Sequence, residues 1–246
     1  MSMETYMEKL KDDNLHIPFL ENDKDKEAAY ILSHKSRLNR TFKAIPETAN
    51  KLKILDIGTT PFTFYIKEQN PNFDVWTVDR TDASRKWCAN AGINLVVANL
   101  EDSLSPFEDG FFDVVIFCEV LEHLVAPHSE ILADIRRILC PSGKLIISVP
   151  NIAHFSNRVK LLLGISPLQD TGVQFIRNWI HGHGHVHEYT RKEIIRTLES
   201  VGFKITKVEM LSRELSILSL KKRILCTFIN LIPSFRLRIF IECESQ

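Results

Sequence analysis

The sequence predicts an α/β fold built on an open, doubly wound and mostly parallel sheet. From residue 53 to about residue 150, short apolar segments alternate with helix-like segments. Such alternation is typical of parallel strands joined by helices that cover both faces of a sheet. The first apolar segment, Lys53–Ile57, leads into a turn at Gly58, and the second, Asp74–Asp79, ends on an acid. Because ligands of such sheets bind beyond the carboxyl ends of the strands, we expect the functional residues at that edge.

Each element has its own signal in the sequence. Strands are expected at Lys53–Ile57, Asp74–Asp79, 94–98, Phe112–Cys118, 144–149, Phe203–Leu211 and 236–243. Helices are expected at 24–43, 64–69, 84–91, 128–139 and 217–231, and after Thr190. The helix after Thr190 has the clearest boundaries. Thr190 is placed as its N-cap, Glu193 as the capping-box partner, and Gly202 lies past its end.

The chain is expected to comprise an N-terminal helical cap, residues 1–45, and a main domain, residues 46–246. Residues 152–188 resemble an insertion into that domain, and residues 216–235 an apolar helix with a basic cluster. The cap and the insertion are expected to cover the site and exclude water. The apolar helix has several possible roles: packing on its own domain, roofing an apolar substrate, forming a homodimer, or lying on an anionic membrane.

Composition narrows the class of protein. Basic and acidic residues balance at 31 each among 246 residues, whereas nucleic-acid binding favours a positive excess. The five cysteines have no Cys-x-x-Cys pair, which suits a reducing compartment and disfavours a thiolate zinc site. The first 13 residues are too charged for a signal peptide, and no apolar run is long enough to span a bilayer. We therefore expect a cytoplasmic protein, with attachment to the inner face of a membrane through 216–235 as an alternative.

The turn after the first strand indicates the kind of cofactor. Asp79 lies about 20 residues past Gly58, where an acid can hydrogen-bond both hydroxyls of a ribose. A nicotinamide-binding turn needs three glycines to approach a pyrophosphate. Here only Gly58 is present, and residues 59–62 are Thr-Thr-Pro-Phe. This turn disfavours a dinucleotide and is more compatible with S-adenosylmethionine, which has no phosphate.

Five segments in order then resemble the class I S-adenosylmethionine-dependent methyltransferases of the type 11 and 23 groups. They are 55–58 (Leu-Asp-Ile-Gly), Asp79, 98–102, 112–118 and 139–145. The resemblance runs from about residue 25 to the end and implies seven strands, the last two forming an antiparallel hairpin. It departs from the family pattern at Thr60 and Phe62, where glycines are usual, and at Asn99, where an aspartate is usual. The cofactor residues that it implies are Asp56, Gly58, Thr59, Thr60, Asp79, Arg80, Asn99, Leu100 and Cys118.

A second group of residues follows the fourth strand. If 119–124 begins a helix, Glu119, Glu122 and His123 share one face and form half of a divalent-metal site. Oxygen ligands favour Mg²⁺, and the imidazole favours Mn²⁺ or a later metal. The Glu-x-x-Glu-His spacing resembles two groups of metal-dependent O-methyltransferases, which modify RNA 3′ ends and ubiquinone precursors. The resemblance to the RNA-end enzymes implies His185, in the histidine-rich loop, as the fourth ligand.

Two alternatives to a metal site remain open at this stage. Without a metal, His185 or His123 could act as a general base, because the pKa of histidine lies near the working pH. Glu122 and His123 could also simply brace the helix. The catalytic candidates are thus Glu119, Glu122, His123 and His185.

The expected function is transfer of a methyl group from S-adenosylmethionine to a hydroxyl oxygen of a sugar, a glycolipid or another small diol. A metal holding that hydroxyl would lower its pKa and make it a better nucleophile. The expected partner is a small-molecule or lipid-linked glycan acceptor. Rival functions are a quinone or phenol O-methyltransferase, an RNA 3′-end 2′-O-methyltransferase, and a cofactor-binding module without activity.

Overall fold

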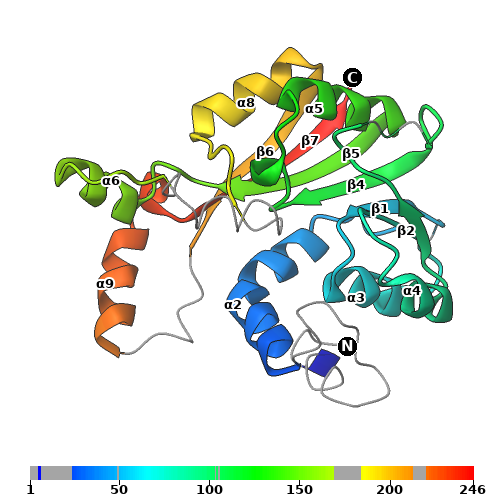
Figure 1. The fold of residues 1–246 in the computed structure, drawn as a ribbon, viewed down its shortest axis with the longest axis horizontal. Coiled ribbons are helices and arrows are strands. Elements are labelled where there is room, and N and C mark those ends of the chain that lie inside the picture. Colours follow the sequence, from blue (N-terminus) through cyan, green and yellow to red (C-terminus); the bar gives the residue numbers. More distant parts are fainter. Residues whose placement is uncertain are drawn as a thin grey trace.

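A seven-stranded sheet organises the protein, as Figure 1 shows. The computed structural model describes residues 5–6, 24–48, 50–102, 104, 106–168, 184–212 and 220–246. The strand order is β3-β2-β1-β4-β5-β7-β6. Strands β1 to β5 pair in parallel, whereas β7 is antiparallel to both of its neighbours, β5 and β6. The predicted doubly wound sheet with an antiparallel C-terminal pair is confirmed.

The strands lie close to the predicted positions. They are β1 (Lys53–Ile57), β2 (Asp74–Asp79), β3 (Asn94–Val97), β4 (Phe112–Cys118), β5 (Leu139–Pro150), β6 (Phe203–Leu211) and β7 (Arg238–Ser245). Strand β5 is longer than predicted, since it already begins at Leu139. Strand β7 starts two residues later than predicted, because a 3-10 turn, η2 (Pro233–Phe235), takes up the preceding residues.

Two layers of helices cover the sheet. Helices α2 (Lys24–Phe42), α3 (Pro61–Gln69) and α4 (Arg85–Ala91) share one apolar cluster with one face of the strands. Helices α5 (His128–Ile138) and α8 (Arg191–Ser200) share the cluster on the opposite face. Side chains alternate between the two faces of β1, so that Ile54 joins the first cluster and Leu55 the second. Asp56 therefore faces the side of α2 and α3, where it meets the N-terminal helix.

Two helices project away from the sheet. Helix α6 (Phe155–Leu162) follows β5, and α9 (Leu220–Asn230) precedes η2 (Figure 1). The predicted helix 217–231 is thus present over its described part, and residues 213–219 and 169–183 lie outside the described residues. Within the described part of the chain, no helix is both long and apolar enough to cross a membrane.

Candidate active site

The turn after β1 is held by the end of β2. Gly58 adopts a left-handed conformation (φ 86°) that a residue with a side chain rarely takes, and its N–H donates to the carbonyl of Val78 at 2.9 Å. The N–H of Thr59 donates to Asp79 Oδ2 at 3.1 Å, and that of Thr81 to Asp79 Oδ1 at 3.2 Å. The Asp79 carboxylate is therefore fixed beside the turn, at the carboxyl end of β2.

The residues that replace the usual glycines start the next helix. Thr60 is the N-cap of α3: its hydroxyl accepts from the N–H of Phe62, and its own N–H donates to Thr63 Oγ1. Pro61 occupies the first turn, where its missing N–H costs nothing. The prediction that this helix begins at residue 64 was wrong because this cap went unrecognised. The hydroxyl of Thr59 bonds to that of Thr77, so both turn threonines have partners inside the protein.

A small enclosed cavity lies between this turn and α2. Asp56, Gly58, Thr60 and Cys118 line it, and its volume is about 30 Å³, room for a water molecule or two. Arg37 of α2 also lines it and is only 6% exposed. Thus four of the predicted cofactor residues meet here, under a helix that closes this end of the site.

Sequence analysis missed Arg37. Its positive charge partly offsets the effect of burial on the neighbouring Asp56 carboxyl. The available signal was its helical spacing: Arg37 lies one turn before Thr41, whose hydroxyl donates to the Arg37 carbonyl at 3.0 Å. That spacing alone does not distinguish a buried arginine from an exposed one.

Asp56→Asn is expected to remove a pH dependence of stability. Burial raises the pKa of Asp56 to about 7. The hydrogen bond from Thr63 (2.6 Å) and the charge of Arg37 both lower this pKa, but burial has the larger effect. Because the folded state then holds the proton more tightly, the free energy of unfolding falls as pH rises from about 4 to about 7, by up to about 1.4 kcal/mol per pH unit.

The asparagine variant should lack this decline and be more stable than the native protein at pH 8. Urea denaturation at pH 5 and pH 8 measures the difference, with the exposed Asp82→Asn as control. The same pH dependence in the native protein and in Asp56→Asn would contradict the assignment.

The remaining predicted cofactor residues lie at the open edge of the sheet. The N–H of Ala98 donates to the Asp79 carbonyl at 2.9 Å, which brings the ends of β2 and β3 together. Asn99 follows in a turn in which its side chain accepts from the N–H of Glu101, and Leu100 is half-buried beside it. Arg80 is exposed. Asp79 and Asn99 thus lie at the ends of adjacent strands.

A second pocket of about 350 Å³ opens at the end of β4. The residues that line it are His34, Glu119, Glu122, His123, Pro150, His154, His185, Glu188, Leu237 and Arg238. The prediction of a helix after β4 was wrong, because a 3-10 turn, η1 (Leu121–His123), forms there instead. All four predicted acceptor-side residues nevertheless reach this pocket.

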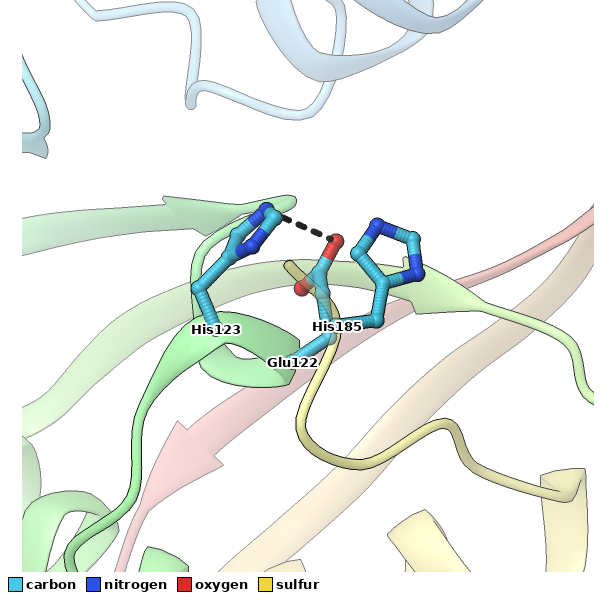
Figure 2. A group of neighbouring side chains, drawn as sticks. All are labelled: Glu122, His123 and His185. Carbon is cyan, nitrogen blue, oxygen red and sulfur yellow. Dashed lines mark ion pairs between the residues drawn. The ribbon is translucent and has the colours of Figure 1, made fainter. Parts of the chain in front are cut away.

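Three of the four form a compact group (Figure 2). One ligand atom each of Glu122, His123 and His185 lies within 4.8 Å of the other two. Glu122 Oε1 is 4.0 Å from His123 Nε2, and the two imidazole rings are 4.9 Å apart, edge to face. The loop that carries His185 is tied to the turn, because the N–H groups of Val186 and His187 donate to the Glu122 carbonyl.

Hydrogen bonds define the tautomer of both imidazoles. His123 Nδ1 lies 2.9 Å from the carbonyl of Gly184, an acceptor, so this nitrogen carries the hydrogen. His185 Nδ1 lies 2.8 Å from the Glu188 carboxylate and donates in the same way. In the neutral form of this tautomer, Nε2 is the nitrogen that carries the lone pair. Metal-binding histidines are commonly oriented by a carboxylate or a carbonyl in this manner.

The two glutamates have opposite electrostatic environments. Burial, and then the negative charge of Glu119, raise the pKa of Glu122 well above its ordinary value. For Glu119, burial acts in the same direction, but Arg37, Arg238 and two hydrogen bonds together hold the pKa below its ordinary value. Glu122 is 1% exposed, and its Oε2 has no hydrogen-bond partner among the described residues.

Glu119 lies outside the three-residue group, contrary to the expected four-ligand set. Its carboxylate accepts from Ser148 Oγ and from Arg238 Nε, both at 2.8 Å. The physical reason is the backbone: Glu119 has φ 58°, a left-handed conformation unusual for a residue with a side chain, so it does not continue into a helix with Glu122. Sequence analysis missed Arg238 and Glu188, since nothing in their local pattern links them to this pocket.

The fold and the match to a methyltransferase family together identify a methyltransferase of the S-adenosylmethionine-dependent class. The chain belongs to the methyltransferase-domain family, whose sequence model matches residues 19–208. A ubiquinone/menaquinone biosynthesis C-methyltransferase from Bordetella avium is 32% identical over 104 residues. That match covers 39% of this chain and 40% of the length of the Bordetella protein.

Solved structures share the fold at low identity. A putative methyltransferase from Haloferax volcanii, solved with the Trm112 methyltransferase activator, has a TM-score of 0.60 at 14% identity, over 90% of this chain and 92% of that one. An S-adenosylmethionine-dependent methyltransferase from Archaeoglobus fulgidus has a TM-score of 0.58 at 18% identity, over 86% and 94% of the two chains. At this identity, the likeness supports the fold and leaves the acceptor open.

Proposed function

We propose that this methyltransferase transfers a methyl group from S-adenosylmethionine to a hydroxyl oxygen of a sugar, a glycolipid or another small diol. We further propose that Glu122, His123 and His185 hold a divalent cation in the acceptor pocket. The observation that carries the proposal is the buried Glu122 carboxyl, whose Oε2 has no partner within the described residues, beside two suitably oriented imidazoles.

The donor set suits a divalent cation. One carboxylate and two imidazole nitrogens favour Mn²⁺ or a later transition metal, and Mg²⁺ is the alternative for an oxygen-rich acceptor. A cation bound there would lower the pKa of an acceptor hydroxyl, as zinc lowers that of bound water from about 16 to about 7. The Glu188 carboxylate and the Gly184 carbonyl orient the two imidazoles.

The remaining residues have supporting roles in this proposal. Asp79 would hydrogen-bond the ribose, and Asn99 and Leu100 would border the adenine. Asp56, Gly58, Thr60 and Cys118, which line the small cavity beside the turn, would border the methionine end. Cys118 and Glu119 are consecutive residues, and each lines one of the two pockets, so donor and acceptor would meet at the end of β4. Ser148 and Arg238 hold Glu119 at this junction.

A second candidate is methylation of a quinone precursor. It is favoured by the partial match to the Bordetella C-methyltransferase, which is named for ubiquinone and menaquinone biosynthesis. The same pocket could take a ring with two neighbouring hydroxyls. The two candidates differ in the bond that is formed, because a quinone C-methyltransferase joins the methyl group to ring carbon.

Transfer of a labelled methyl group distinguishes these functions. The purified protein is incubated with methyl-labelled S-adenosylmethionine, Mn²⁺ and one acceptor class at a time: a lipid-linked saccharide, a catechol-type quinol or a small RNA. We expect an O-methyl product from the saccharide, identified by carbon NMR, and loss of the product on chelation. A carbon-bound methyl on the quinol would favour the second candidate, and label in RNA would contradict both.

A further inference from the structure

A basic groove lies on the far side of the loop that follows β5. Its volume is about 740 Å³, and it runs between the start of α8, the beginning of α6 and the η2 turn. Four cationic side chains line it: Arg158, Arg191, Lys192 and Arg196. Among the described residues that line this groove, none is acidic.

The cations of α8 are available to a ligand. Within the described residues, Arg191, Lys192 and Arg196 make no ion pair and no side-chain hydrogen bond. The nearest acid of the helix, Glu193, is already engaged: its carboxylate accepts from the N–H of Thr190 and pairs with His187. The groove is therefore an anion-attracting site, and none of its three α8 cations pairs with a described carboxylate.

Apolar side chains also line the groove and lie around it. Ile195, Met210 and Pro233 contribute to the lining. At its α6 side, Arg158 stacks on the ring of Phe235, which joins the start of α6 to η2. The tip of α6 and the following turn expose Leu161, Leu162, Leu163 and Ile165, and α9 and the residues after it expose Ile224, Phe228, Leu231 and Ile232. Leu162 is 86% exposed and Phe228 is 66% exposed.

The groove and the exposed apolar residues lie at the same end of the molecule. Figure 1 shows α6 and α9 projecting beyond the sheet, at the end where α8 begins. The exposed leucines suit the acyl region of a membrane surface, and the unpaired arginines beside them suit its anionic headgroups. A soluble anionic protein would match the cations but would leave the leucines in water.

We propose that the groove binds the phosphate headgroup of an anionic bilayer lipid while the apolar tips of α6 and α9 enter the interface. This site extends the earlier expectation for residues 216–235 to a headgroup pocket on α8 and to α6. It is independent of the proposed methyl-transfer chemistry. It would hold the acceptor pocket, which lies across the 150–154 segment, close to the membrane surface.

Vesicle flotation of the full-length protein tests the proposal. We expect binding to vesicles that contain phosphatidylglycerol and none to pure phosphatidylcholine. Arg191→Glu/Arg196→Glu should weaken the binding at least about 10-fold. The variant should stay folded, because both side chains are exposed and Arg191 lies in the first turn of α8, where a glutamate is favourable. Leu162→Gln/Leu163→Gln should also weaken binding, and both residues are exposed.

The matched control is Arg85→Glu/Lys86→Glu, an equal charge reversal on the exposed part of α4, on the other face of the sheet. It should bind like the native protein. Equal binding to both vesicle types, equal loss in the control, or no vesicle binding would each overturn the proposal. Thermal stabilisation by inorganic phosphate without vesicle binding would assign the groove to a free anion and overturn it too. Cofactor binding by the same variants, measured by calorimetry, reports on the methyltransferase site separately.

Discussion

Glu122→Gln is expected to reduce methyl transfer at least about 100-fold and to leave the affinity for S-adenosylmethionine within about twofold. The glutamine keeps the size of the side chain but cannot provide an anionic oxygen between the two imidazoles. A metal site contributes several kcal/mol to such a reaction, and about 3 kcal/mol corresponds to roughly 100-fold. Initial rates with saturating Mn²⁺ and cofactor calorimetry measure the two effects.

The histidine-rich loop provides matched controls for this result. His185→Ala should lose metal and activity in the same way as Glu122→Gln. His187→Ala should keep both, since His187 Nε2 pairs with Glu193 at 2.9 Å, outside the metal group. Metal content after gel filtration, measured by mass spectrometry, separates loss of metal from unfolding. Full activity of Glu122→Gln, or equal losses in both histidine variants, would contradict the proposed site.

Asp79→Ala is expected to weaken binding of S-adenosylmethionine about 100-fold. A carboxylate that accepts two ribose hydroxyls forms two charge-assisted hydrogen bonds of about 1.5 kcal/mol each, which together correspond to roughly two factors of ten. Calorimetric titration measures the dissociation constant. Asp79 also accepts from the N–H groups of Thr59 and Thr81, so circular dichroism must show that the variant is folded.

The control for this prediction is Asp74→Ala, at the amino end of the same strand. Asp74 accepts from the side chain of Asn94, far from the turn at Gly58. We expect native affinity in this variant. Native affinity in Asp79→Ala would instead mean that the ribose is held elsewhere, and comparable losses in both variants would point to a general effect on β2.

The strands were predictable because each is a short apolar segment between turn residues, and β1, β2, β4 and β6 have the predicted bounds. The Thr190 capping box was also predictable, since both partners lie within one turn. Features that depend on distant contacts were not. Nothing local indicates that Arg238 reaches Glu119 or that the loop of Gly184 contacts His123.

Two errors have a local cause. Residues 59–62 resemble an altered cofactor turn, but Thr60 and Pro61 are also a strong helix start. Spacing alone puts Glu119 on a helix with Glu122, whereas the left-handed backbone of Glu119 prevents that helix from starting there. Both residues nevertheless line one pocket, because both follow β4 at the carboxyl edge of the sheet.

Anomalous diffraction from crystals grown with Mn²⁺ tests the metal site most directly. The proposal predicts a single strong peak within bonding distance of Glu122, His123 Nε2 and His185 Nε2, and no peak there in Glu122→Gln crystals. An absent peak in the native protein, together with undiminished methyl transfer in excess chelator, would contradict it.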